Sequence, residues 1–197
     1  RDCFTYRSHT RIIEEVCPPL PASYQIKNAC MAIAVVEELV ARGYTVPQDA
    51  ICRGIEKTRF PGRFEVLRKR PDVIIDGAHT PEGLRLLKSA FRSLYPGVRP
   101  LLLLGVLGDK NYELLVRIIA PAAKEVICVK PQGNRGLEPE VLASLIRSMG
   151  IPACSAPTIV GGFELLMDKA SKDDVILATG SLYMIGPVRR ACGIADE

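Results

Sequence analysis

Apolar and polar positions alternate in two rhythms from about residue 71 onward. Short apolar runs predict buried strands, whereas longer stretches with an apolar residue every three or four positions predict helices that bury one face. We expect strands at Val73–Ile75, Leu101–Val106, Glu125–Val129 and Val175–Thr179, and helices at Pro81–Leu94, Tyr112–Ile119, Glu138–Met149 and Phe163–Ala170. The alternation of strands with helices predicts an α/β fold, a mostly parallel sheet flanked by helices.

The first part of the chain follows a different pattern. The proline-rich run Cys17–Pro21 interrupts regular structure, and a long alanine-rich helix is predicted from Tyr24 to Arg42, where Gly43 ends it. A shorter helix is expected from Pro47 to Lys57, and the turn-rich run Arg59–Gly62 is typical of a linker. We therefore predict two domains, a helical one at residues 1–58 and the α/β domain at residues 59–197.

Composition narrows the class of protein. With 197 residues and 48% apolar content, the chain can bury a core and is not disordered. The net charge of +4 comes from 26 basic and 22 acidic residues that are interspersed, so we expect no nucleic-acid partner. No apolar run approaches the roughly 18 residues of a membrane span, and Arg1 begins no signal peptide. These features predict a cytoplasmic protein without a membrane partner.

The seven cysteines are never two or three residues apart, as cysteines in metal or redox pairs usually are. We therefore expect them to be reduced and to act as small apolar residues. The chain has only two histidines, so no zinc site is predicted, and no metal ligand is assigned.

One segment has the pattern of a binding site at a strand-to-helix corner. The apolar run Val73–Ile75 leads into Asp76, Gly77, Ala78 and His79, and Thr80 and Pro81 follow where a helix should begin. Threonine is a good helix cap, and proline suits the first helical turn. Backbone amides at such a corner can hold an anion.

Together with four other segments, this corner resembles the signature of the folylpolyglutamate synthase and dihydrofolate synthase family of the Mur ligase superfamily. The family patterns H-Q-x-x-N-A, W-P-G-R, D-G-A-H-N-P, G-V-x-x-D-K and G-S-L-Y resemble, in that order, Tyr24–Ala29, Phe60–Arg63, Asp76–Pro81, Gly105–Lys110 and Gly180–Tyr183. The resemblance covers nearly the whole chain.

The resemblance implies a Rossmann-like carboxy-terminal domain that follows a central ATPase domain, of which residues 1–58 would be a helical remnant. The implied reaction is the ATP-dependent ligation of L-glutamate to a folate through an acyl phosphate. The chain has no G-x-x-x-x-G-K-[ST] run, which would cradle the phosphates of ATP. We therefore expect an inactive fragment, with ATP and Mg²⁺ bound mainly by a missing amino-terminal domain.

The resemblance also implies roles for single residues. Those expected near ATP are Asn28, Arg63, Asp76 and Lys110, the last beside Asp109; those expected at the incoming glutamate, in catalytic and substrate-binding roles, are His79 and Ser181. Each residue type also has a purely structural explanation, as a turn arginine, a strand-end acid or a helix cap. The argument requires Arg63, Asp76, His79 and Ser181 to share one rim of the sheet.

The sequence departs from the family pattern at two positions and leaves other functions open. Thr80 replaces the usual asparagine, and Phe60 replaces the usual tryptophan. Threonine can still cap a helix, but any contact made by the asparagine amide would be lost. A muramyl-peptide ligase domain and a non-catalytic binding module of the same fold both stay possible. The sequence does not distinguish dihydrofolate synthase from folylpolyglutamate synthase or from an enzyme with both activities.

Overall fold

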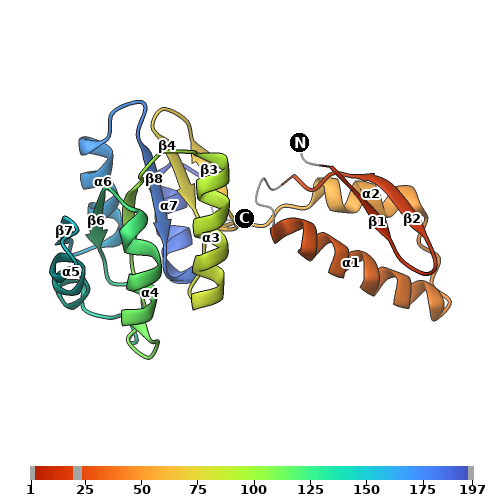
Figure 1. The fold of residues 1–197 in the computed structure, drawn as a ribbon, viewed down its shortest axis with the longest axis horizontal. Helices are drawn as coiled ribbons and strands as arrows, with labels where there is room; N and C mark the ends of the chain where they lie inside the picture. Colours follow the sequence, from red (N-terminus) through yellow and green to blue (C-terminus); the bar gives the residue numbers. More distant parts are fainter. Residues whose placement is uncertain (1–2, 20–23, 195–197) are drawn as a thin grey trace. The chain divides into compact units, whose positions relative to one another are not determined.

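The computed structural model describes residues 3–19 and 24–194. The chain divides into two compact units, Arg1–Phe60 and Pro61–Glu197, so the division follows residue 60 where the sequence predicted residue 58 (Figure 1). Part of the predicted proline-rich interruption, residues 20 and 21, lies outside the described residues, as does Arg1.

The first unit pairs a β-hairpin with two helices. Strands β1 (Phe4–Arg7) and β2 (Ile12–Val16) are antiparallel, and helices α1 (Tyr24–Ala41) and α2 (Gln48–Lys57) follow them. Its small core consists of Tyr6, Ile13, Val16, Ile33 and Ile51. Both predicted helices are confirmed, but the prediction of a purely helical segment was wrong because it missed the hairpin.

The expectation of seven reduced cysteines was also wrong, because Cys3 and Cys17 form a disulfide. Phe4 pairs with Val16 across the hairpin, which places Cys3 and Cys17 opposite each other with their Cα atoms 4.3 Å apart. The other five cysteines are free. Among them, Cys128 behaves as expected of a core residue, since its burial raises the pKa of its thiol to about 12.

A six-stranded sheet forms the centre of the second unit. Its strands are β3 (Glu65–Arg68), β4 (Asp72–Ile75), β5 (Leu101–Leu104), β6 (Glu125–Cys128), β7 (Ala153–Ser155) and β8 (Val175–Thr179). They lie in the order β3-β4-β8-β5-β6-β7, and all pairs are parallel except β3 with β4. The predicted mostly parallel sheet is confirmed, whereas the edge strands β3 and β7 were missed.

Helices connect the strands and cover the sheet. They are α3 (Pro81–Leu94), α4 (Tyr112–Ile119), α5 (Pro139–Ser148), α6 (Ile159–Lys169) and α7 (Ile185–Ala191), with short 3-10 turns η1 (Ala120–Ala122) and η2 (Leu182–Met184). Helix α6 begins four residues before its predicted start because Thr158 caps it and two glycines continue it. A Cβ on Gly162 would lie 2.6 Å from Val129 Cγ1, so glycine lets α6 approach the sheet closely.

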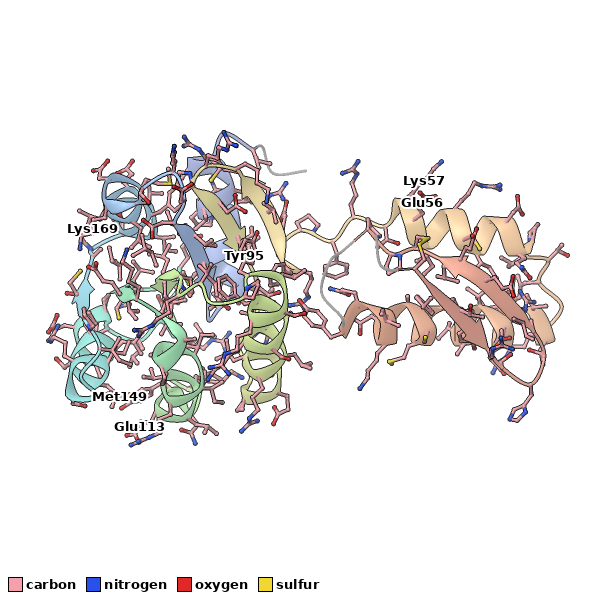
Figure 2. The ribbon with its side chains drawn as sticks, turned by 45° about the horizontal axis from the view of Figure 1, so that its top comes forward. Glu56, Lys57, Tyr95, Glu113, Met149 and Lys169 are labelled. Atoms are coloured by element: carbon pink, nitrogen blue, oxygen red, sulfur yellow. A yellow bond between two sulfur atoms is a disulfide. The ribbon has the colours of Figure 1, made fainter. Side chains whose placement is uncertain are left out.

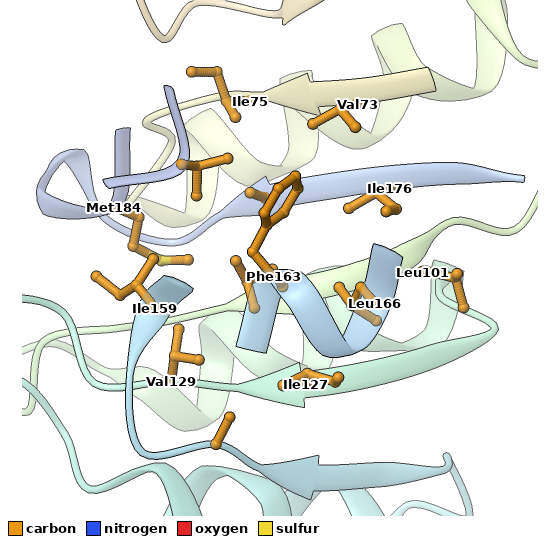
Figure 3. Packing of buried hydrophobic residues seen from close by; sticks show 14 residues of the cluster. Val73, Ile75, Leu101, Ile127, Val129, Ile159, Phe163, Leu166, Ile176 and Met184 are labelled. Atoms are coloured by element: carbon orange, nitrogen blue, oxygen red, sulfur yellow. The ribbon is translucent and has the colours of Figure 1, made fainter. Parts of the chain in front are cut away.

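Both faces of the sheet are buried, which explains why all four leucines of β5 are inaccessible to solvent. On one face, Phe163 and Leu166 of α6 pack against Ile127 and Ile176 (Figure 3). Helices α3 and α4 lie side by side on the other face (Figure 1). Among the helices of residues 3–19 and 24–194, none has both the length and the apolar content that a membrane crossing requires.

Candidate functional site

Three corners meet at the edge of the sheet where the parallel strands end. The amide of Asp76, after β4, donates to Ala178 O at 3.0 Å, and the amide of Gly180, after β8, donates to Ala78 O at 3.1 Å. The amide of Gly105, after β5, donates to Thr179 O at 3.3 Å. The structure therefore brings together the three loops that the sequence placed at one edge.

Asp76 joins the P-G-R turn to the D-G-A-H corner. Its side chain is 2% exposed, and its two oxygens accept hydrogen bonds from the amides of Phe64 and Ala78, each at 2.8 Å. A further backbone bond runs from the amide of Gly77 to Gly62 O at 2.8 Å. These bonds give Asp76 a structural role, because they hold two loops that are twelve residues apart in fixed register.

Arg63 lies against the same corner. A Cβ on Gly77 would lie 3.5 Å from Arg63 Nη1 and 2.3 Å from Leu182 Cδ2. A glycine at this position therefore lets the guanidinium and the loop after β8 approach the backbone closely. The fixed fork of an arginine beside exposed backbone is suited to binding a carboxylate or a phosphate.

His79 is half-buried at the start of α3, and its Nδ1 lies 2.8 Å from Gly77 O. A carbonyl oxygen only accepts, so Nδ1 must carry the proton in this bond. In the neutral ring, Nε2 is then left as a hydrogen-bond acceptor. Thr80 caps α3 by accepting from the amide of Gly83 at 3.1 Å, which confirms the predicted cap.

Ser181 lies next to this corner in sequence and in space. It is 2% exposed and caps η2, because its Oγ accepts from the amide of Tyr183 at 3.2 Å. The structural explanation for Ser181 is thus confirmed. Its hydroxyl proton can still be donated to a second group.

Arg135 belongs to this edge and was missed by the sequence analysis. Its Nη1 donates to Asp109 Oδ2 at 2.9 Å, and hydrogen bonds to Tyr183 and Asp109 raise the pKa of the guanidinium. Its carbonyl accepts from the amide of Gly108 at 2.7 Å. Arg135 thereby links the loops after β5, β6 and β8. The signal was present as an arginine between two glycines in the loop after a buried strand.

The remaining two predicted site residues have few constraints. Lys110 is exposed in the loop after β5, next to Asp109. Asn28 lies on α1 in the first unit, where its Nδ2 donates to Gln25 Oε1 at 2.8 Å. Gln25 is 6% exposed, and its Nε2 has no hydrogen-bond partner among the described residues.

These details bear on the cofactors that the resemblance implies. The buried Nε2 of Gln25 is a donor that needs an acceptor, and a ring nitrogen of adenine could supply one, so the residues around Asn28 fit a nucleotide base. Magnesium fits less well. In the described ranges 3–19 and 24–194, no group of three histidine, cysteine or acidic residues is arranged to hold a metal ion.

Comparison with known proteins gives one family. Residues 62–182 match the family described as Mur ligase, glutamate ligase domain. A probable bifunctional folylpolyglutamate synthase/dihydropteroate synthase of Haloferax volcanii is 30% identical over 173 residues, which cover 87% of this chain and 20% of that protein. The folylpolyglutamate synthase of Lacticaseibacillus casei is 30% identical over 196 residues, which cover 95% of this chain and 42% of that protein.

The fold also matches solved structures. The folylpolyglutamate synthase of Mycobacterium tuberculosis, solved with ADP and AMPPCP, superimposes with a TM-score of 0.85 at 27% identity. The match covers 94% of this chain and 44% of that one. The chain thus spans less than half the length of each of these three proteins.

Proposed function

Because the chain belongs to the Mur ligase family through its glutamate ligase domain, we propose that it supplies the amino-acid-binding part of an ATP-dependent ligase that joins L-glutamate to a folate. The amide bond would form when the amine of glutamate attacks an acyl phosphate on the folate and inorganic phosphate leaves. The five matching motifs and the names of the two relatives support a folate as the acceptor.

The observation that carries the proposal is the junction held by Asp76. It sets the guanidinium of Arg63, the ring of His79 and the hydroxyl of Ser181 around the same corner of the sheet. We assign to these groups the positioning of charged reactants, which is the main contribution a protein makes to this kind of transfer.

In this assignment, Arg63 contacts a phosphate of the nucleotide, and Lys110 adds a second cation near it. The free Nε2 of His79 accepts a hydrogen bond from the amine of glutamate and so orients it for attack. Ser181 donates its hydroxyl proton to a carboxylate of the same glutamate. Asp76 acts through the backbone that it holds.

ATP, when bound with Mg²⁺, supplies the phosphoryl group that activates the folate carboxylate. The residues in this chain that would touch the nucleotide are Arg63, Lys110 and Asn28, the last together with the unpartnered donor of Gln25. The phosphate-cradling loop is not among these 197 residues, so we propose that another part of the enzyme provides it. On this view, the 197-residue chain alone does not ligate glutamate.

The test uses the complete enzyme that contains this chain and measures incorporation of labelled glutamate into a folate. His79→Ala and Ser181→Ala should each raise the KM for glutamate by about tenfold or more, because one charge-assisted hydrogen bond is lost. His9→Ala, which changes an exposed histidine of the first unit, is the matched control and should have no effect. Unchanged kinetics in both site variants would favour the non-catalytic binding module.

A second arm separates the acceptors. The same assay run with a muramyl-peptide precursor in place of the folate should give no product. Comparing dihydropteroate with tetrahydrofolate then distinguishes a dihydrofolate synthase from a folylpolyglutamate synthase. Turnover of ATP, folate and glutamate by the isolated 197-residue chain would contradict its proposed dependence on another part of the enzyme.

A further inference from the structure

A row of cations lines the surface where α3 and α4 lie side by side. Arg85, Lys88 and Arg92 are three and four residues apart on α3 and therefore face the same way. Arg117 is on the neighbouring α4. Only Arg85 has an acidic neighbour, Glu82 at 3.5 Å; in the part of the chain that the structure describes, no carboxylate pairs with the other three.

These cations surround two hollows that share Lys88 and Arg92. The first, of about 410 Å³, is walled mainly by the four cations. The second, of about 430 Å³, is lined by the buried side chains of Phe91, Leu102 and Leu177 and lies beside Tyr95. Together they form one groove with a cationic half and an apolar half.

The groove is at a different place from the corner described above. Tyr95 directly follows the last residue of α3, and Leu102 is near the start of β5, so the apolar half is at the opposite edge of the sheet. Figure 2 shows Tyr95 at that end, with Glu113 of α4 toward the other end.

The positive charges in the groove are crowded. Lys88 Nζ donates to Ile118 O at 2.9 Å, which fixes the ammonium between the helices. Burial and the nearby Arg92 lower the pKa of Lys88. Two neighbouring cations without an anion cost free energy that a bound anion would offset.

We propose that the groove between α3 and α4 binds a small molecule with several negative charges and a flat apolar ring. The ring would occupy the half beside Phe91 and Tyr95, and the charges would pair with Arg92, Arg117 and Arg85. Hollows of this size suit small ligands, and guanidinium groups pair equally with carboxylates and phosphates.

Two sources share this chemistry. One is a ring with a chain of carboxylates, such as a pteroyl oligo-γ-glutamate; its relevance rests on the proposed function, of which it would be a product. The other is a nucleoside triphosphate. The cationic half is long enough for a chain of charges, because α3 rises about 1.5 Å per residue between Arg85 and Arg92.

The test measures binding of pteroyl-tri-γ-glutamate and of ATP to the 197-residue chain by titration calorimetry. We expect one of the two to bind, and pteroic acid, which has the ring but a single carboxylate, to bind at least about tenfold more weakly. Arg92→Gln and Arg117→Gln should each weaken binding about tenfold. Lys172→Gln, at an exposed lysine before β8, is the matched control and should leave affinity unchanged.

Two further measurements keep the result unambiguous. The unfolding temperature of each variant without ligand should equal that of the wild type, since Arg92 and Arg117 are exposed. His79→Ala should leave binding in the groove unchanged, so the outcome is independent of the ligase assay. The proposal is overturned if neither compound binds at about 1 mM, or if binding depends on His79 and not on the two arginines.

Discussion

At the scale of single residues, Asp76 shows how a buried charge can serve a site without touching its ligands. A carboxylate that is 2% exposed is stable only if hydrogen bonds replace its water, and the amides of Phe64 and Ala78 do so. Since Phe64 also has a left-handed φ of 46°, the turn that carries Arg63 is held in a conformation that it would not adopt alone.

Asp76→Asn tests this role. Asparagine offers one acceptor oxygen where aspartate offers two, and its amide group would face a backbone N–H. We expect the second unit to lose about 2–3 kcal/mol of stability. The amides of Phe64 and Ala78 should also lose protection from hydrogen exchange, measured by mass spectrometry of the corresponding peptides. Asp173→Asn, at an exposed turn, is the control, and equal protection in both variants would contradict the role.

The sequence predicted some of these residue-level features for a physical reason. Thr80 could be predicted as a cap because capping depends on a local pattern of three or four residues. Arg135 could not, because its partners Asp109 and Tyr183 are 26 and 48 residues away and come together only through the sheet. The assigned contacts of His79, Ser181 and Asn28 with substrates stay predictions.

At the scale of elements, the buried strands of the sheet were predictable, and the edges were not. Strands β5 and β8 are continuous apolar runs because helices cover both of their faces. The edge strands β3 and β7 are short and partly exposed, so they lack that pattern. Helix α7 was missed because its second and third residues are glycine and proline.

The hairpin of the first unit was missed for a related reason, since its anchor is a side chain on a distant helix. Glu37 of α1 accepts hydrogen bonds from Tyr6 Oη at 2.7 Å and from Ser8 Oγ and Thr10 Oγ1 at 2.6 Å. These bonds, first those of Ser8 and Thr10, lower the pKa of Glu37. One carboxylate thus connects the hairpin to α1.

This arrangement predicts how the first unit responds to pH. Because the pKa of Glu37 is lower in the folded chain, its contribution is complete above the unfolded value of roughly 4.3 and is lost as the pH falls through the folded value. We expect the unfolding temperature of the first unit to drop between about pH 4 and pH 2.

Glu37→Gln should lower the stability at neutral pH and reduce this acid dependence, because glutamine does not titrate. Glu38→Gln is the matched control, since Glu38 is the next residue on the same helix and makes only an exposed pair with Arg42. Thermal unfolding followed by circular dichroism from pH 7 to pH 2 provides the measurement. Equal acid slopes for the wild type and Glu37→Gln would show that other groups control it.

At the scale of the whole molecule, the two ends of the parallel strands have different chemistry. The loops at the carboxyl end fix Arg63, His79 and Ser181 with backbone hydrogen bonds. The opposite end opens into a groove between α3 and α4 with an excess of positive charge. The first arrangement follows from the sheet topology and could be predicted. The second depends on which side chains two helices place next to each other.

The division into two compact units leads to the last prediction. Residues 57–61 are exposed and join units that each have a core of their own. Limited digestion with trypsin should therefore cut first after Lys57 or Arg59, because cleavage needs accessible backbone that can leave its local structure. The fragment from Phe60 onward should retain the circular dichroism of an α/β domain. In the variant with Lys57→Gln and Arg59→Gln this early fragment should disappear, whereas a first cut inside residues 61–194 would mean that the second unit does not hold together by itself.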